Sequence, residues 1–414
     1  MNVYLVGGAV RDELLGLPVH ERDWVVVGST VDDMLARGFR QVGNDFPVFL
    51  HPHSQEEYAL ARVERKTGVG YQGFAFDTAK EVTLEQDLER RDLTINAIAK
   101  APDGTLVDPY GGRADIEERV IRHVSDAFSE DPLRVLRAAR FTTRFASLNF
   151  SVSPDTMQLL SDIVAQGEMP ALAAERVWSE TARALMHDKP SVYFQMLRAC
   201  GALAVLFPEV DALFGVPQSE QWHPEIDTGL HTLMVIDMAA SMDAALPVRF
   251  AALVHDLGKA KTPPDQWPNH HGHERVSRKL VTQFGQRLRV PGECVRLAEY
   301  VAEFHTHCHR ALELNAKTLL KTFESIGAFR KPGIVEAFAQ ACEADARGRD
   351  GLEARDYPQA AYFRGAFKAA QSVENAAIAK TGVSGKAFGE AVRRARLRAI
   401  DVYQSSTDAG APSG

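Results

Sequence analysis

The sequence predicts an α+β protein, in which an N-terminal head built on a mixed sheet, covered on one side, is followed by an all-α remainder. Over residues 1–125, strand-like segments such as VYLVGG, WVVVG, FPVFLH and EYALARV alternate with short helical segments. From about residue 127 onward, the apolar residues recur with helical spacing, as in DPLRVLRAARFTTRF and AERVWSETARALMH. A chain of 414 residues has room for about two to four domains with sizeable cores.

Prolines mark an expected domain boundary, and a glycine-spaced segment marks an expected loop within the head. Pro208 and the loop FGVPQSEQWHPE, which contains Pro217 and Pro224, interrupt the helical pattern. The segment RKTGVGYQGFAFD, from Arg65 to Asp77, is basic, aromatic and glycine-spaced, so we predict a mobile loop there. We expect a head at residues 1–125, a helical neck and body at 126–224, a compact helical module at 225–349, and C-terminal helices with a flexible tail at 350–414.

The composition limits the possible partners and compartments. A formal charge of -8 argues against nucleic-acid binding over the whole surface, because such proteins usually carry a basic excess. RNA binding would therefore use local patches, although the second of the two candidates is equally well explained as a solvated helix face. The candidates are Arg134, Arg137, Arg140 and Arg144, and then Arg393, Arg394, Arg396 and Arg398.

Cysteine spacing and hydropathy favour a cytoplasmic protein. The four cysteines lie far apart, form no CxxC pair and indicate no disulfide framework, as expected in a reducing compartment. The N-terminus lacks the pattern of a targeting segment, and no apolar run approaches the length of about 18 residues that a membrane span needs. We expect neither secretion nor a membrane partner.

The first residues carry a pattern typical of phosphate binding. Val3–Val6 form an apolar strand, and Gly7 and Gly8 allow a turn with close backbone approach. Ala9–Leu15 then begin a helix whose free N–H groups favour an anion. Arg11 falls in the first helical turn, where it is placed to hold phosphate.

The segment HERDWVVVG predicts a second strand that opens with acids. Because side chains alternate along a strand, Glu21 and Asp23 share one face, whereas Arg22 and Trp24 point to the other. Two carboxylates one strand repeat apart can hold Mg²⁺ together with substrate phosphates. Taken alone, the pattern is equally well explained by a solvated strand end.

Further motifs carry a family resemblance over nearly the whole chain. They are RRDLTINAIA from Arg90, DPYGG from Asp108, EDPLRVLRAARF from Glu130 and ERVWSE from Glu175. With GGAVRD, they resemble in order and spacing the class II tRNA nucleotidyltransferases, the CCA-adding enzymes of the DNA polymerase beta superfamily. The later VHDLGK is similar to the bacterial subgroup with an HD phosphohydrolase domain. One position differs, since Glu21 stands where the family pattern has Asp.

The resemblance implies a reaction and its residues. The 3′-hydroxyl of an immature tRNA would attack the α-phosphate of CTP, twice, and then of ATP, with release of pyrophosphate. Glu21 and Asp23 would be the catalytic Mg²⁺ ligands, and the extra methylene of Glu21 is expected to slow the reaction. The glycine-spaced loop would assist the change from C to A addition. The nucleotide-binding residues would be Gly8, Arg11, Arg91, Asp131, Arg134, Arg137 and Arg140.

Asp131 and Arg134 suit base recognition. Residues three apart share a helix face, and Arg137 and Arg140 continue the row. Cytosine and adenine both present an amino donor beside an unprotonated ring nitrogen, which a carboxylate and a guanidinium together match. By spacing alone, an ordinary surface ion pair is the simpler interpretation of Asp131 and Arg134. Arg137 and Arg140 are nucleotide contacts by resemblance, with the tRNA backbone as the alternative.

Two aspartates in these motifs are expected to have local roles only. Asp92, next to the triphosphate contact Arg91, is predicted to cap the helix that follows it. Asp108 of DPYGG is predicted to order a turn.

A second candidate site lies in the helical module. His231, the pair His255 and Asp256 in VHDLGK, and Asp345 fit the H…HD…D pattern of metal phosphohydrolases. By resemblance, the site would use Ni²⁺ or Mg²⁺ to hydrolyse phosphomonoesters or 2′,3′-cyclic phosphates. Further histidines are candidates that we leave unassigned, because a histidine-rich loop is more often polar surface; they are His270, His271, His273, His305 and His307.

Three other functions compete with CCA addition. A bacterial poly(A) polymerase shares the head motifs, but the intact HD segment and the lack of a long basic tail argue against it. A non-catalytic tRNA-binding factor, or a phosphohydrolase with a vestigial head, would also fit parts of the pattern. The expected partners are tRNA, CTP and ATP, and the protein is expected to be a monomer or a homodimer.

Overall fold

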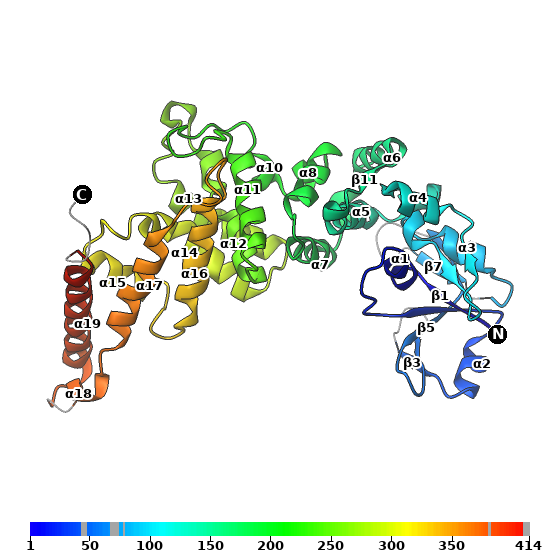
Figure 1. Ribbon diagram of the computed structural model, residues 1–414, viewed down its shortest axis with the longest axis horizontal. Coiled ribbons are helices and arrows are strands. Elements are labelled where there is room, and N and C mark those ends of the chain that lie inside the picture. Colours follow the sequence, from blue (N-terminus) through cyan, green and yellow to red (C-terminus); the bar gives the residue numbers. More distant parts are fainter. Residues whose placement is uncertain (43–47, 67–73, 78, 380–381, 409–414) are drawn as a thin grey trace. The chain divides into compact units, whose positions relative to one another are not determined.

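The computed structural model of the protein describes residues 1–42, 48–66, 74–77, 79–379 and 382–408 (Figure 1). Two compact units are present, one made of Met1–Ala184 with Val192–Leu206, and the other of Leu185–Ser191 with Phe207–Gly414. The tip of the predicted mobile loop and the end of the predicted flexible tail lie outside the described residues. A mixed sheet followed by helices confirms the predicted α+β class.

The first unit is built on a seven-stranded sheet with the order β3-β4-β5-β2-β1-β8-β9. Its strands are β1 (Asn2–Val6), β2 (Asp23–Val27), β3 (Arg40–Val42), β4 (Val48–Leu50), β5 (Glu57–Leu60), β8 (Ala99–Lys100) and β9 (Leu106–Val107). The pair of β2 with β5 is parallel and the other pairs are antiparallel. A separate antiparallel pair joins β6 (Val63–Lys66) and β7 (Phe74–Asp77).

The register of the two central strands positions the acids. Val6, the last residue of β1, pairs with Asp23, the first residue of β2. The glycine turn that follows Val6 therefore lies beside the start of β2. Glu21 precedes this strand, so the prediction that Glu21 and Asp23 alternate along one strand is wrong. The reason is that β2 pairs with β1 only from Asp23 onward.

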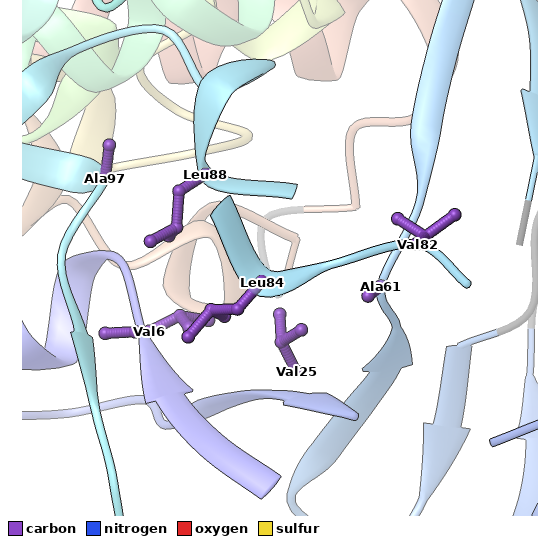
Figure 2. Close-up of a cluster of buried hydrophobic side chains, with 8 residues drawn as sticks. Val6, Val25, Ala61, Val82, Leu84, Leu88 and Ala97 are labelled. Carbon is purple, nitrogen blue, oxygen red and sulfur yellow. The ribbon is translucent and has the colours of Figure 1, made fainter. Parts of the chain in front are cut away.

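Apolar clusters cover both faces of the sheet, so the expectation of a sheet covered on one side is wrong. On one face, Val25 packs with Val6, Leu84 and Leu88, the last two from α3 (Leu84–Glu89) (Figure 2). On the other face, Val26 packs in a second cluster with Met34, Phe39, Phe49 and Leu60. Met34 lies on α2 (Val31–Ala36), a helix too short for its covering face to be evident from periodicity.

We expect Leu88→Ala to lower the free energy of unfolding of the head by about 2–5 kcal/mol, since Leu88 is fully buried and its truncation leaves a cavity. The change is measured by urea denaturation, in which hydrogen exchange at the amides of α3 reports the unfolding of the head. Leu35→Ala, at a position that is 47% exposed, is the matched control. A loss below about 1 kcal/mol at Leu88 would contradict the packing argument.

Helices form most of the rest of the first unit. They are α1 (Gly8–Leu14), α4 (Gly112–Glu118), α5 (Leu133–Arg144), α6 (Pro154–Ala165), α7 (Ala174–Leu185), α8 (Ser191–Ala199) and α9 (Ala202–Leu206), with short 3₁₀ turns that include Thr94–Asn96 and Asp126–Glu130. One short strand, β11 (Ser151–Val152), pairs with β10 (Val120–Ile121), so the expected all-α remainder is wrong at this point. Two residues are too few to leave a periodic signal.

The second unit contains helices and loops and no β-strand among its described residues. Its helices are α10 (Pro208–Asp211), α11 (Thr228–Ser241), α12 (Leu246–Val254), α13 (His273–Arg287), α14 (Gly292–His309), α15 (Ala316–Ser325), α16 (Gly333–Arg347), α17 (Pro358–Gln371), α18 (Asn375–Ala379) and α19 (Gly385–Asp408). Helix α12 packs against α11, α14 and α16, and α13 against α14. Among the described residues, no helix is both long enough and apolar enough to cross a lipid bilayer.

Candidate nucleotide and metal sites

Arg91 lies against the glycine turn of the head, near the acids Glu21 and Asp23. Gly7 has a φ of 68°, and a Cβ at this position would lie 2.9 Å from Nη1 of Arg91. Both Asp23 and Glu21 are exposed. Partial loss of hydration raises the pKa of Asp23, the charge of Arg91 lowers it, and the charge of Glu21 raises it again. The two carboxylates and the guanidinium are therefore close enough to interact where β1 ends and β2 begins.

Arg91 is held in place from the α3 side. Its Nη2 lies 3.2 Å from Oδ2 of the buried Asp87, and its Nη1 donates to the carbonyl of Asn96. Its Nε is buried without a hydrogen-bond partner. Nη1 and Nη2 each carry a second N–H, and the side chain is 18% exposed, so Arg91 can still donate to an anion at the glycine turn, in keeping with the prediction that it contacts the triphosphate.

Arg11 points into the protein rather than out of the first helical turn. It is 2% exposed, and its guanidinium donates to Oδ1 of Asp12 at 2.8 and 2.9 Å and to Oδ1 of Asn96. The rings of Phe141 and Phe145 flank it, each with its centroid 5.1 Å away. Burial lowers the pKa of Arg11. Its guanidinium still lies under the turn, since a Cβ at Gly8 would be 3.4 Å from Nη2.

The predicted base-reading pair at the start of α5 has separate internal partners. Asp131 accepts from the backbone N–H of Leu133 and, at 2.7 Å, from Arg176. Arg134 donates to the carbonyls of Ala127 and Arg90 at 2.8 and 2.7 Å. Arg134 is 7% exposed, so the alternative of a surface ion pair does not describe it.

Arg137 and Arg140 form an ion-pair row with distant acids. Arg137 contacts Oδ2 of Asp92 at 2.7 Å, and Arg140 donates to Glu180 at 2.5 Å. Burial alone would raise the pKa of Asp92, but the charge of Arg137 and a hydrogen bond from Asn96 hold it well below its ordinary value. Asp92 was expected to cap the helix that follows it, but the turn Thr94–Asn96 has Leu93 at its N-cap and no side-chain cap hydrogen bond. Asp92 instead anchors α5 through Arg137.

Asp108 has the expected local role. Its two carboxylate oxygens accept from the backbone N–H groups of Gly112 and Arg113 at 2.7 and 2.9 Å, so it orders the turn into α4.

In the second unit, the structure brings the four predicted ligands together. His231 lies on α11, His255 and Asp256 follow α12, and Asp345 lies on α16. Oδ1 of Asp345 lies 3.1 Å from Nε2 of His231 and 3.8 Å from Nε2 of His255. Oδ2 of Asp256 lies 3.2 Å from Nε2 of His255. All four side chains are buried, with exposed fractions of 0–4%.

Two histidines that the sequence left unassigned join this cluster. Nε2 of His273 lies 3.2 Å from Oδ1 of Asp256, and Nε2 of His305 lies 3.7 Å from the same oxygen. One usable signal was the apolar setting of His305, which falls on the buried face of α14 with Val301 and Cys308. A histidine on such a face needs a polar partner inside the protein.

The donor set fits a divalent metal. Three buried polar atoms of the cluster make no hydrogen bond: Nε2 of His255, Oδ1 of Asp256 and Nε2 of His273. Imidazole nitrogens and carboxylate oxygens are common ligands of divalent transition metals. Asp256 and Asp345 also line a pocket of about 610 Å³. A substrate can therefore reach the cluster.

Gly258 makes this arrangement possible. A Cβ at Gly258 would lie 2.2 Å from the carbonyl oxygen of His273 and 2.7 Å from the backbone nitrogen of Ser277. The turn Leu257–Lys261 therefore packs directly against α13 and brings Asp256 to His273. Lys259 adds a positive charge, with Nζ 2.6 Å from Oδ2 of Asp256.

Three family models match consecutive parts of the chain. The poly(A) polymerase head domain matches residues 3–122, the probable RNA- and SrmB-binding site of polymerase A matches residues 149–214, and the HD domain matches residues 228–326. With the acids at the start of β2 and the histidine cluster, these matches define a polymerase-type nucleotidyltransferase that also carries an HD domain.

Curated relatives narrow this class to one family. The multifunctional CCA protein of Pseudomonas fluorescens strain Pf-5 is 57% identical over 404 residues, which cover 98% of this chain and 99% of the relative. That of Hahella chejuensis is 56% identical over 98% of this chain and 96% of its own. The chain belongs to the multifunctional CCA protein family, which confirms the resemblance noted in the sequence.

Solved structures share the fold at lower identity. A CCA-adding enzyme in complex with CTP aligns with a TM-score of 0.65 and 21% identity, over 97% of this chain and 87% of that one. The Thermotoga maritima CCA-adding enzyme complexed with tRNA aligns with a TM-score of 0.60 and 18% identity, over 98% and 91%.

Proposed function

We propose that this protein adds C, C and A to the 3′ end of tRNA from CTP and ATP, and that its HD domain is a metal-dependent phosphohydrolase. The observation that carries the first activity is the register of β1 with β2, which sets the glycine turn beside Asp23 and Arg91. The full-length similarity to multifunctional CCA proteins, and the fold shared with CCA-adding enzymes solved with CTP and with tRNA, support it.

Glu21 and Asp23 are the residues that would hold Mg²⁺ in the head. Exposed carboxylates suit a hard cation that is shared with phosphate oxygens. When bound, Mg²⁺ lowers the pKa of the attacking hydroxyl and neutralises phosphate charge. Arg91 counters the negative charge of the triphosphate, and Gly7 and Gly8 allow the phosphates to approach the backbone.

Base selection would fall to the start of α5. A carboxylate and a guanidinium match the shared edge of cytosine and adenine. In the nucleotide-free protein, Asp131 and Arg134 are held by Arg176 and by backbone carbonyls. We infer that base binding replaces these partners of Asp131 and Arg134 with the edge of the base. Arg137 and Arg140 either stay paired with Asp92 and Glu180 or turn toward the nucleotide.

In the HD domain, His231, His255, Asp256 and Asp345 are the residues that would hold a metal. Imidazole ligands favour Ni²⁺ over Mg²⁺, the two ions that the sequence suggests. Such an ion supplies Lewis acidity and a nucleophile at neutral pH. Lys259, which lines the pocket, would attract the phosphate of a 2′,3′-cyclic or monoester substrate.

The remaining expectations concern the oligomeric state and the cellular compartment of the protein. All four cysteines are free and buried, in keeping with a reducing cytoplasm. Light scattering of the purified protein distinguishes a monomer from a homodimer.

One experiment tests the transferase. The full chain is incubated with a tRNA transcript that lacks its last three nucleotides, and with labelled CTP or ATP. We expect defined addition of the three missing residues. A long A tail would instead indicate a poly(A) polymerase, and no incorporation would indicate a binding factor or a hydrolase with a vestigial head.

We expect Glu21→Asp to speed nucleotide addition. A catalytic group displaced by about 1 Å can cost on the order of a hundredfold in rate, and Glu carries one methylene more than the Asp of the family pattern. Single-turnover rates of CMP incorporation with Mg²⁺ measure the effect. Asp32→Asn, at an exposed acid on α2, is the control. An unchanged or lower rate in Glu21→Asp would exclude the argument.

A further inference from the structure

We propose that the pocket of the second unit binds the nucleoside part of its substrate, with Trp222 stacking on the base. This inference rests on the proposed phosphohydrolase function, and it concerns residues of the pocket other than the metal ligands. It names Trp222 as a residue that sets specificity. A phosphate attached to a nucleoside would be preferred to the same phosphate without a base.

The pocket is larger than a phosphate group requires. Its volume is about 610 Å³, and pockets of about 300–1,000 Å³ typically enclose whole small organic molecules. Lys259, which would attract the phosphate, accounts for only part of the lining. Aromatic and uncharged polar side chains also line it, among them Trp222, Tyr357 and Gln359. The lining therefore suits an organic group beside the phosphate.

The indole of Trp222 is available for stacking. Its side chain is 55% exposed, and it is the only aromatic one among the exposed large apolar side chains of the described residues. Aromatic side chains bind nucleic-acid bases by stacking on them face to face. An exposed indole in the wall of a pocket is thus suited to a base.

The backbone of Trp222 is held although its ring is exposed. Its N–H donates to the carbonyl of Ser219 at 3.0 Å, and its own carbonyl accepts from Nη1 of Arg349 at 2.9 Å. The loop around it is closed by a hydrogen bond of 2.8 Å from the N–H of Gln218 to the carbonyl of Ile226. A wall that is already ordered loses little entropy when a ligand binds.

Two side chains connect this loop to the phosphate side of the pocket. Arg349, which contacts the carbonyl of Trp222, also has Nη2 3.5 Å from Oδ1 of Asp345. Nζ of Lys259 donates to Oε1 of Gln218 at 2.8 Å. One guanidinium therefore separates the backbone of Trp222 from the carboxylate of Asp345. Such proximity suits a nucleotide, in which one sugar joins the base to the phosphate.

Gln359, near the start of α17, offers an unused acceptor to the same ligand. Its Oε1 is buried and has no hydrogen-bond partner, and the residue lines the pocket. A buried acceptor without a donor is unfavourable, so a ligand that donates to it gains affinity. Sugar hydroxyls and base amino groups are donors, whereas a phosphate dianion can only accept. This acceptor therefore favours a nucleoside over a phosphate alone.

Stacking also predicts how selective the site should be. Every base has a π-face, so a stacking wall tolerates different bases. The pocket should therefore accept adenosine and uridine phosphates alike. Because Trp222 would contact the base and not the reacting phosphate, its loss should weaken binding and leave the chemical step unchanged.

Hydrolysis by the full-length protein with Ni²⁺ tests the proposal. The substrates are 2′-AMP, 2′-UMP and glycerol 2-phosphate, a phosphomonoester without a base. We expect Trp222→Ala to raise the KM of both nucleotides by about 5- to 150-fold, the usual effect of removing a stacking ring. The kcat values, and both constants for glycerol 2-phosphate, should stay within about twofold of the parent.

Two further variants separate stacking from a general disturbance of the loop. Trp222→Phe keeps an aromatic face and should restore most of the affinity for nucleotides. Ile226→Ala removes a side chain that is 42% exposed on the same loop and does not line the pocket, so it should behave as the parent.

The other outcomes decide between the two proposals. A KM for glycerol 2-phosphate that rises as much as that of the nucleotides in Trp222→Ala would overturn the nucleoside site, as would a parent protein with equal KM values for 2′-AMP and glycerol 2-phosphate. If the parent hydrolyses none of the three substrates, the phosphohydrolase proposal fails. Tryptophan fluorescence then decides the nucleoside site: 2′-AMP should quench the parent more than Trp222→Phe, and equal quenching would overturn it.

Discussion

Asp23→Asn is expected to reduce nucleotide addition by about 10³-fold or more. The substitution keeps the size of the side chain but removes the charge that faces Glu21 and Arg91 at the start of β2. Loss of a metal-binding carboxylate forfeits several kcal/mol of transition-state stabilisation, and each 1.36 kcal/mol is a factor of ten in rate. Single-turnover incorporation of labelled CTP into a tRNA that lacks CCA measures the loss.

A control substitution of another acid in the head distinguishes an effect at the metal site from the general effect of losing a negative charge. Asp32→Asn removes an exposed carboxylate from α2 and should leave the rate within about twofold, as expected of a surface substitution. Phosphohydrolase activity should persist in both variants and report that the chain is folded. A rate for Asp23→Asn within about tenfold of the parent would exclude Asp23 as a metal ligand.

Local patterns predicted the α+β class, and together with the family resemblance they indicated two candidate sites, but they did not give the partners of the buried charges. Residues three apart on a helix can be placed on one face from sequence, which correctly aligned Arg134, Arg137 and Arg140. Their partners come from distant segments. Arg137 contacts Asp92, which is 45 residues away, and Arg140 contacts Glu180 on α7. Such pairs follow from tertiary packing, which no local spacing encodes.

These pairs explain why three of the recognised motifs occur together. A buried guanidinium needs a carboxylate, because an unpaired charge inside a protein costs several kcal/mol. The ERVWSE segment supplies Glu180 for Arg140 and Arg176 for Asp131, and the RRD segment supplies Asp92 for Arg137. The motifs of α5 and α7 and the RRD segment thus form one charge network.

Sequence reasoning failed at Arg11 and His273 for different reasons. Arg11 was expected to face phosphate and His273 to lie in a polar surface segment, but both side chains are buried. Arg11 sits in the predicted helical turn, but the rings of Phe141 and Phe145 draw its guanidinium inward, which the N-terminal motif alone could not reveal. His273 belongs to a histidine-rich segment that resembles polar surface. Its position against Asp256 depends on the absence of a side chain at Gly258, fifteen residues earlier.

His255→Ala is expected to lower hydrolysis of a 2′,3′-cyclic nucleotide by more than about 100-fold while CCA addition continues. His255 is 1% exposed, and its Nε2 faces both Asp256 and Asp345. Loss of a residue that merely supports a metal ligand typically costs about 10–100-fold, so the loss of a ligand should cost more. Addition should persist because the acids of the head belong to the other compact unit.

Paired assays of two variants test this prediction. Hydrolysis is measured with added Ni²⁺, and CCA addition with Mg²⁺, on His255→Ala and Asp23→Asn in parallel. Each variant should lose one activity and keep the other. His307→Ala, whose ring contacts Thr322 rather than the cluster, should keep both. If His255→Ala loses both activities but melts at the same temperature as the parent, the two sites do not act independently, and the assignment of one activity to each unit fails.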